Sequence, residues 1–124
     1  MRERIFLGSA GFAGAISVAV DALARHALAG GAHRIELTTI SARYGLTHAA
    51  ALLAIALLCQ RYERRFWLSL AGWLFVAALI LFCATLDLVA FGAPAWLLAL
   101  TPVGGTAFVA GWAALLVAAL VTRR

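Results

Sequence analysis

Apolar residues occur in four long runs along the chain, separated by short segments that contain arginine, glycine or proline. Each run is close to the roughly 20 residues that an α-helix needs to cross about 30 Å of hydrocarbon. Helices are required because lipid offers no partners to the backbone polar groups of an open strand. The pattern therefore predicts an all-α fold, an integral membrane four-helix bundle, as a single domain over residues 1–124. The predicted transmembrane helices comprise residues 5–28, 39–60, 66–91 and 95–121.

The composition supports lipid as the solvent of this chain. Apolar residues make up 65% of the 124 positions and charged residues only 12%, and the mean hydropathy is +1.01. A soluble domain of this size could not bury so much apolar surface, because most of its side chains lie near the surface. We therefore expect the lipid bilayer to be its main partner.

The positions of the arginines predict the orientation. Seven of them flank the predicted inner helix ends, at the N-terminus, in the segment 60–65 and at the C-terminus, while Arg25, Arg34 and Arg43 lie on the opposite side. Positively charged loops stay in the cytoplasm. We expect a multi-pass protein of the bacterial inner (plasma) membrane with both termini cytoplasmic. The loop between Gly30 and Thr38, and the tight turn at residues 92–94, would then face outward.

The net charge of +5 could also indicate nucleic-acid binding. However, most of the arginines lie just outside the apolar runs, where side chains anchor helix ends at lipid headgroups. We therefore expect no nucleic-acid partner.

Small residues recur on the first predicted helix, with Gly8, Gly11 and Gly14 at three-residue spacing. Small side chains let helix backbones approach closely, and in lipid such packing replaces the hydrophobic driving force. The simpler interpretation is a seam inside the bundle. The alternative is a face for association with a second copy of the chain.

Ionisable residues at membrane depth are functional candidates because each is costly to insert. Counted at about 1.5 Å per residue, Asp21 and Arg43 lie at a similar level and could pair between the first two helices. The simpler account pairs Asp21 with Arg25, four residues further along the same helix. Asp87 would extend to the outer interface. By this count His48 alone lies clearly inside the hydrocarbon.

Tyr44 and His48 are four residues apart and therefore share a helix face. A neutral histidine between helices usually hydrogen-bonds to a carbonyl or hydroxyl group and fixes the packing. The functional alternative is a proton-linked site, because histidine titrates near physiological pH.

The segment from Thr101 through Pro102 to Gly104 and Gly105 opens the last predicted helix on its outer side. Proline suits a first helical turn, and the paired glycines allow either a kink or a close helix contact. A break there would expose backbone groups of the kind that small transporters use to bind ions. The simpler interpretation is a helix start followed by tight packing.

Several motifs together resemble a known family. Arg43-Tyr44 with His48-Ala49 is similar to an R-Y-x-x-x-H-A motif, and residues 101–105 with Gly111-Trp112 are similar to a T-P-x-G-G and G-W pair. The end of the first helix (His26-Ala27-Leu28) and the third helix (Gly72, Leu74-Phe75 and Leu81-Phe82) add to this likeness. The chain thus resembles the domain of unknown function 423 family of small bacterial membrane proteins. The resemblance implies four membrane helices and brings no assigned activity.

The chain also departs from that family's pattern. Asp21 and Ala24 occupy positions where glycines are typical, and Asp87 occupies one where tyrosine is typical. Residues 83–85, Cys-Ala-Thr, replace a typical S-G-S. A role that depends on Asp21 or Asp87 would therefore be particular to this branch.

No motif indicates catalysis. The sequence contains no Cys-x-x-Cys, and its histidines and carboxylates are too dispersed to predict a metal site. We expect no enzyme activity and no cofactor. The leading hypothesis is a non-enzymatic accessory or structural membrane component, with another membrane protein or a second copy as its partner. The alternative is a small transporter or channel, proton-linked and dimeric.

Overall fold

The computed structural model describes residues 1–27, 31–63 and 65–121, and over these residues the chain is helical with short connections. Helix α1 comprises Arg2–Ala27 and α2 comprises Ala32–Arg61. The third span is continuous and consists of α3 (Phe66–Ala78), the π-helix η1 (Leu79–Ala84) and α4 (Thr85–Ala90). The fourth consists of the 3₁₀-helix η2 (Ala95–Leu100) and α5 (Thr101–Val121). All four spans are long and apolar enough to cross a membrane.

The predicted outer loop from Gly30 to Thr38 is wrong in its larger part, because α2 begins at Ala32. Leu37 and Thr38 are buried, and Leu37 packs against Leu86 and Ala90 of α4. Hydropathy identifies only the apolar part of a helix that crosses lipid. The contacts of Leu37 with α4 stabilise additional helical turns before that apolar part. The predicted end of the first helix at Leu28, and Gly30, lie outside the described residues.

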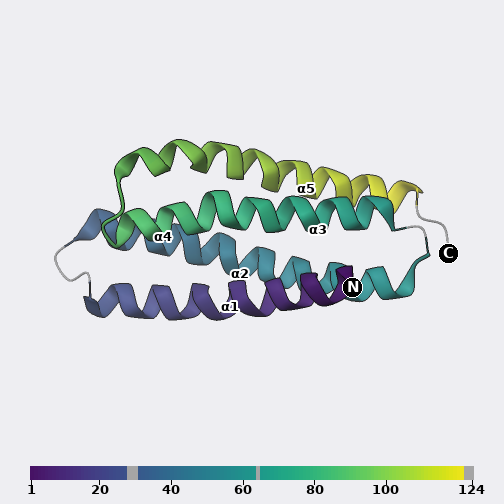
Figure 1. Ribbon diagram of the computed structural model, residues 1–124, viewed down its shortest axis with the longest axis horizontal. Coiled ribbons are helices and arrows are strands. Elements are labelled where there is room, and N and C mark those ends of the chain that lie inside the picture. The colour runs from purple at the N-terminus through teal and green to yellow at the C-terminus, as the bar shows by residue number, and fades with distance from the viewer. Residues whose placement is uncertain (28–30, 64, 122–124) are drawn as a thin grey trace.

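The four spans form an elongated bundle in which α1 lies along α2, and α3 lies along α5 (Figure 1). Helix α2 also contacts α3, η1 and α4, whereas α1 and α3 share few contacts. Helix α1 begins and α5 ends at the same end of the bundle, which we call the termini end. At the opposite, distal end, Gly92 adopts a φ of 110° in the turn before Pro94. This left-handed geometry suits glycine and confirms the predicted tight turn.

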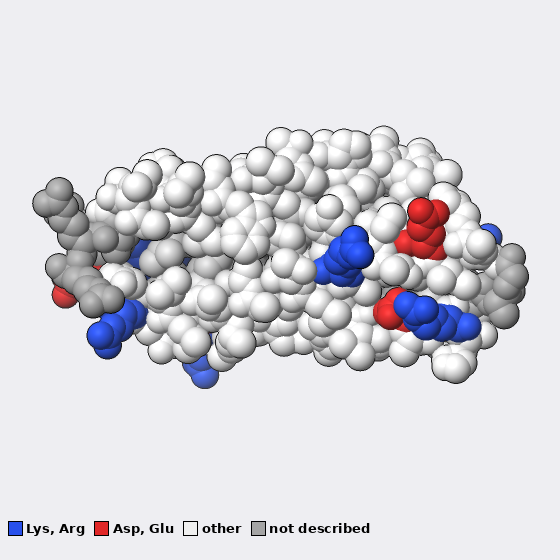
Figure 2. All heavy atoms as spheres, turned by 180° about the vertical axis from the view of Figure 1, so that it is seen from behind, with Lys and Arg blue, Asp and Glu red and all other residues white. Residues whose placement is uncertain are grey.

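The core of the bundle is closed by aromatic rings that pack against glycines. Phe6 of α1 lies over Gly72 of α3, and Phe75 of α3 lies over Gly111 of α5, so close that a Cβ at either glycine would collide with the ring. Large apolar residues such as Val109 cover the outside of the bundle. In Figure 2 most charged side chains lie toward the two ends of the visible face, one basic side chain lies nearer its middle, and the rest of the length is white. This distribution is that of a protein surrounded by lipid.

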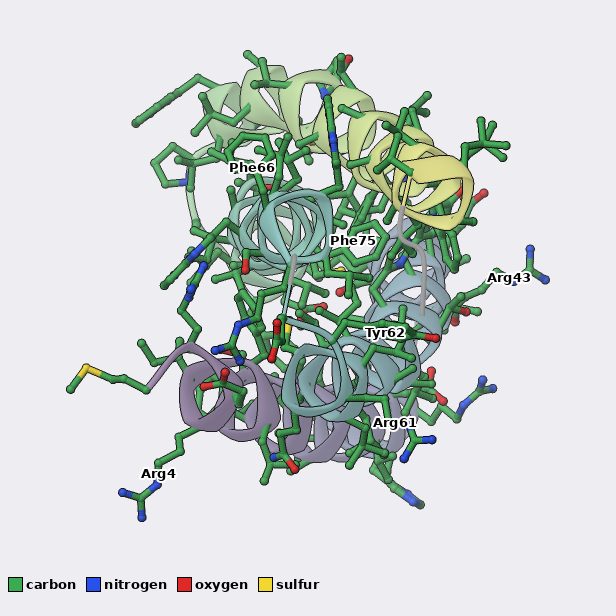
Figure 3. All side chains as sticks on the ribbon, turned by 90° about the vertical axis from the view of Figure 1, so that its right-hand side faces the viewer. Arg4, Arg43, Arg61, Tyr62, Phe66 and Phe75 are labelled. Atoms are coloured by element: carbon green, nitrogen blue, oxygen red, sulfur yellow. The ribbon has the colours of Figure 1, made fainter. Side chains whose placement is uncertain are left out.

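An arginine joins three helices at the termini end. The guanidinium of Arg65 donates hydrogen bonds to Glu3 of α1 and to the carbonyl oxygen of Cys59 of α2, both at 2.5 Å. Arg2 donates a further bond of 2.9 Å to Ser69 Oγ of α3. By contrast, Arg4 and Arg61 point away from the bundle (Figure 3). The arginines at this end therefore differ in their structural roles.

Candidate functional site

His48 lies in the middle of the bundle with both ring nitrogens hydrogen-bonded. Its Nδ1 is 2.7 Å from the carbonyl oxygen of Tyr44, and Trp112 of α5 donates its indole N–H to His48 Nε2 at 3.0 Å. Since the indole can only donate, Nε2 accepts and Nδ1 carries the proton. The histidine is therefore a neutral, fully satisfied group that links α2 to α5, as the simpler interpretation of the sequence predicted.

Aromatic rings from three helices surround His48. Phe108 of α5 stacks on the imidazole with a ring-centroid distance of 3.8 Å, and Phe75 of α3 meets it edge-on at 5.0 Å. The Tyr44 ring lies parallel to the imidazole at 6.1 Å. A second proton on Nε2 would face the N–H of Trp112, so this cluster disfavours the charged histidine. The proton-linked role proposed from the sequence stays a prediction.

The two predicted charged residues, Asp21 and Arg43, do not meet. Asp21 pairs with Arg25 at 3.4 Å on the same helix, as the spacing of four residues predicted. Arg43 is exposed on α2 and points away from the bundle (Figure 3). The alternative pairing of Asp21 with Arg43 between helices is therefore wrong. Neither residue joins the His48 cluster.

Gly104 lies against the π-helix η1 of the third span, and Thr101 lies against the first residue of α4. A Cβ at Gly104 would be 2.6 Å from the backbone nitrogen of Phe82, whereas at Gly105 it would meet only a Phe82 ring carbon at 3.9 Å. Thr101 Oγ1 is 3.0 Å from Thr85 Oγ1. The predicted tight packing is thus confirmed at Gly104, and Gly105 takes little part in it.

The helix irregularity lies in η1 rather than at the paired glycines. Ser41 of α2 donates a hydrogen bond of 3.2 Å to the carbonyl oxygen of Cys83, and Thr85 Oγ1 lies 2.8 Å from the Leu81 carbonyl oxygen. These side chains satisfy carbonyl groups of the widened turn. π-Helical turns are often found at functional sites. The sequence of η1 contains no glycine or proline, so no local signal could have predicted it.

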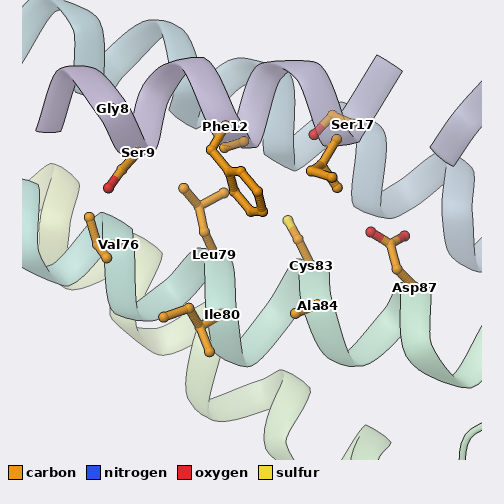
Figure 4. Close-up of a pocket in the computed structure, with 12 residues that line it drawn as sticks. Gly8, Ser9, Phe12, Ser17, Val76, Leu79, Ile80, Cys83, Ala84 and Asp87 are labelled. Carbon is orange, nitrogen blue, oxygen red and sulfur yellow. The ribbon is translucent and has the colours of Figure 1, made fainter. Parts of the chain in front are cut away.

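A groove of about 400 Å³ lies between α1 and the third span, and we call it the α1–η1 groove (Figure 4). Its walls are mostly apolar, and Ser17, Cys83 and Asp87 are among its polar lining residues. The Oδ1 atom of Asp87 is buried and finds no hydrogen-bond partner among the described residues. Asp87 therefore lies near the distal end of its span, as predicted, but its Oδ1 atom is buried and does not extend outward into the interface. Asp87 is one of the residues that line the groove, and the sequence had predicted no groove there.

Two of the three glycines of α1, Gly8 and Gly11, make no close contact inside the bundle. Within the described part of the chain, no heavy atom lies within 4 Å of a Cβ built on Gly8 or Gly11, and Gly14 meets only Ala49 at 3.8 Å. The favoured interpretation of this stripe as an internal seam is wrong for Gly8 and Gly11. Ala15, Ala19 and Ala22 are exposed as well. We call these five exposed residues the small face of α1.

No group of three or more histidine, cysteine, aspartate or glutamate side chains that could hold a metal ion occurs in residues 1–27, 31–63 and 65–121. The strongest chemical feature of the described chain is the Asp87 carboxylate in the α1–η1 groove, whose buried Oδ1 has no hydrogen-bond partner among the described residues.

Comparison with known proteins identifies the family. Residues 20–105 match the family described as "Protein of unknown function (DUF423)". The chain belongs to this family. The match covers the motifs of the second and third helices and residues 101–105, and it confirms the resemblance that those motifs predicted.

Relatives of the DUF423 chain are named membrane proteins. The UPF0382 membrane protein of Haemophilus influenzae is 33% identical over 115 residues, which cover 89% of each chain. The UPF0382 inner membrane protein YgdD of Escherichia coli is 31% identical over 126 residues, covering 100% of this chain and 95% of its own. YwdK of Bacillus subtilis is 29% identical over 107 residues, which cover 85% and 87% of the two chains. No solved structure matches the chain. With its four apolar spans, this DUF423 chain is an integral membrane protein of an inner-membrane family.

Proposed function

We propose that this protein is a non-enzymatic structural component of the inner membrane that associates with a second copy of itself through the small face of α1. The observation that carries the proposal is that Gly11 of α1 is exposed and makes no close contact, and that Gly8 is exposed at the edge of the α1–η1 groove. Four glycines of the other helices each lie so close to a neighbouring helix that a Cβ would collide: Gly45, Gly72, Gly104 and Gly111. Gly8 and Gly11 make no such contact within the described chain.

Glycine on an exposed helix face has a cost that association would offset. It destabilises a helix by roughly 0.5–1 kcal/mol relative to alanine. In lipid, small residues on a helix surface favour association because two backbones can approach closely and gain packing contacts. A face built of glycine and alanine fits the same face of a second copy, and two-fold dimers are the commonest oligomers.

The polar groups in the bundle give less support to a transporter or channel. His48 has both nitrogens hydrogen-bonded to α2 and α5, and Asp21 pairs with Arg25 on its own helix. In this proposal they fix helix packing, and both chain termini lie in the cytoplasm, as the arginine distribution supports.

Cysteine cross-linking in native membranes tests the proposal. Gly11→Cys places a thiol on the small face, and Ala113→Cys places one on the exposed side of α5 as a matched control. The two native cysteines are buried and serve as an internal background. We expect oxidation to yield a covalent dimer with Gly11→Cys and not with Ala113→Cys.

A second variant tests whether the small face itself drives association. Gly11→Leu would prevent close backbone approach, and the dimer fraction measured by native mass spectrometry should fall, whereas Ala113→Leu should leave it unchanged. A monomer in native membranes, or a dimer that cross-links equally well through α5, would contradict the proposal.

A further inference from the structure

The α1–η1 groove has an apolar mouth and a more polar floor. Phe12 of α1 and Ile80 of η1 line it with 71% and 61% of their surfaces exposed, so the groove opens sideways between two membrane helices. Ser17 and Cys83 lie buried at its floor. Asp87 stands at the distal end of the lining residues (Figure 4). An elongated ligand lying parallel to the helices would fit this shape.

Asp87 lies close to the level of the lipid headgroups. It is three residues before Ala90, the last residue of α4, which is about 5 Å at 1.5 Å per residue. No described cationic side chain lies within ion-pair distance of it. At the same end, Asp21 pairs with Arg25, and Glu36 is 4.0 Å from His33 on α2. The groove therefore carries one carboxylate without a counter-ion among the described residues.

The Asp87 carboxylate determines which chemical class of ligand the groove would prefer. Lipid tails are as apolar as the walls of the groove, so hydrocarbon alone gains little by moving from the bilayer into it. A buried carboxylate, in contrast, is costly unless it is paired and hydrogen-bonded. An ammonium group offers a positive charge and three hydrogen-bond donors. The groove volume of about 400 Å³ is within the usual range for small-molecule sites.

We propose that the α1–η1 groove binds a membrane lipid with an ammonium headgroup, whose acyl chain lies along the groove and whose ammonium pairs with Asp87. The sideways opening and the position of Asp87 near headgroup level favour a lipid over a cation from the aqueous phase. This inference goes beyond the proposed self-association and does not depend on it. Lipid preference and cross-linking are separate measurements, so either proposal can fail alone.

Native mass spectrometry of the full chain in mild detergent measures this preference directly. The probes are dioleoyl phosphatidylethanolamine, which carries the ammonium, and dioleoyl phosphatidylglycerol, which has the same acyl chains without it. We expect one phosphatidylethanolamine per chain, preferred by about tenfold, which corresponds to roughly 1.4 kcal/mol. In Asp87→Asn, which keeps the side-chain shape, the preference should fall to about one.

Two matched controls separate the site from general effects. Asp21→Asn removes a carboxylate at the same end that already has a partner, and it should retain the preference. Ala13→Phe would fill the groove and should lower phosphatidylethanolamine binding severalfold, whereas Ala113→Phe on α5 should not. If Ala13→Phe fails to fold, the isosteric Asp87→Asn variant still decides the question.

Three results would overturn the inference. The first is equal binding of the two lipids by the wild-type chain. The second is a preference that survives Asp87→Asn. The third is Asp87-dependent binding of dodecyltrimethylammonium, a cation supplied from the aqueous phase, without any preference for phosphatidylethanolamine over phosphatidylglycerol.

Discussion

At the scale of single residues, polar side chains in this bundle serve chiefly to join helices. His48 accepts a hydrogen bond from Trp112 of α5 while its other nitrogen bonds within α2. Spacing alone predicted that Tyr44 and His48 share a face, because residues four apart do so on any helix. The partner Trp112 is 64 residues away along the chain, and no sequence period could have identified it.

Removing the indole donor should destabilise the bundle. Trp112→Phe keeps an aromatic ring but leaves His48 Nε2 without its partner, and we expect a loss of about 1 kcal/mol, the usual size for a hydrogen bond between membrane helices. Thermal unfolding in detergent micelles measures this loss of stability. Trp96→Phe is the matched control because Trp96 is 68% exposed. Equal effects of the two changes would show that the hydrogen bond contributes nothing.

At the scale of helices, the third span and α5 approach each other through a glycine and a π-turn. Gly104 lies against the backbone of Leu81 and Phe82 in η1. The sequence indicated that the paired glycines allow either a kink or a close helix contact. In the structure α5 is a regular helix there, and Gly104 makes the close contact. The irregular turn appears in the partner helix instead, where Ser41 and Thr85 bind its carbonyl groups.

Alanine substitutions at the two adjacent glycines should differ sharply. A methyl group at Gly104 would lie 2.6 Å from a backbone nitrogen, which cannot move aside like a flexible side chain. We expect Gly104→Ala to cost about 1–3 kcal/mol, as overpacking does. Gly105→Ala meets only a ring at 3.9 Å and should be neutral or slightly stabilising. Chemical denaturation in mixed micelles measures both. Similar losses at both positions would contradict the assignment of the close contact to Gly104.

At the scale of the whole molecule, arginines contribute both to orientation and to the closure of the termini end. Arg61 and Arg65 contribute equally to the positive charge of the connection between α2 and α3. Arg65 donates hydrogen bonds to Glu3 and to the Cys59 carbonyl oxygen, whereas Arg61 is exposed. The two arginines are therefore equivalent for membrane orientation, but only Arg65 connects helices.

Substituting each of these two arginines separates the roles. Arg65→Gln should lower the melting temperature of the purified protein, because Glu3 loses its partner from α3 and the Cys59 carbonyl oxygen loses a donor. Arg61→Gln should leave it nearly unchanged. A reporter fused to either terminus should indicate the cytoplasm in both variants, because each variant keeps six of the seven arginines of that side. A reporter that places the two termini on opposite faces would contradict the four-span orientation.

The sequence by itself determined the membrane class, the four spans, the turn at Gly92 and the local pair of Asp21 with Arg25. Each of these depends on short-range chemistry, namely apolar length, backbone freedom or helical spacing. The tertiary structure alone decided that α2 begins at Ala32, that Gly8 and Gly11 of α1 are exposed, and that Asp87 lines a groove with its Oδ1 lacking a hydrogen-bond partner among the described residues. Those features depend on which helices become neighbours, and in lipid that choice depends on the fit of whole helix surfaces, which a single linear pattern does not encode.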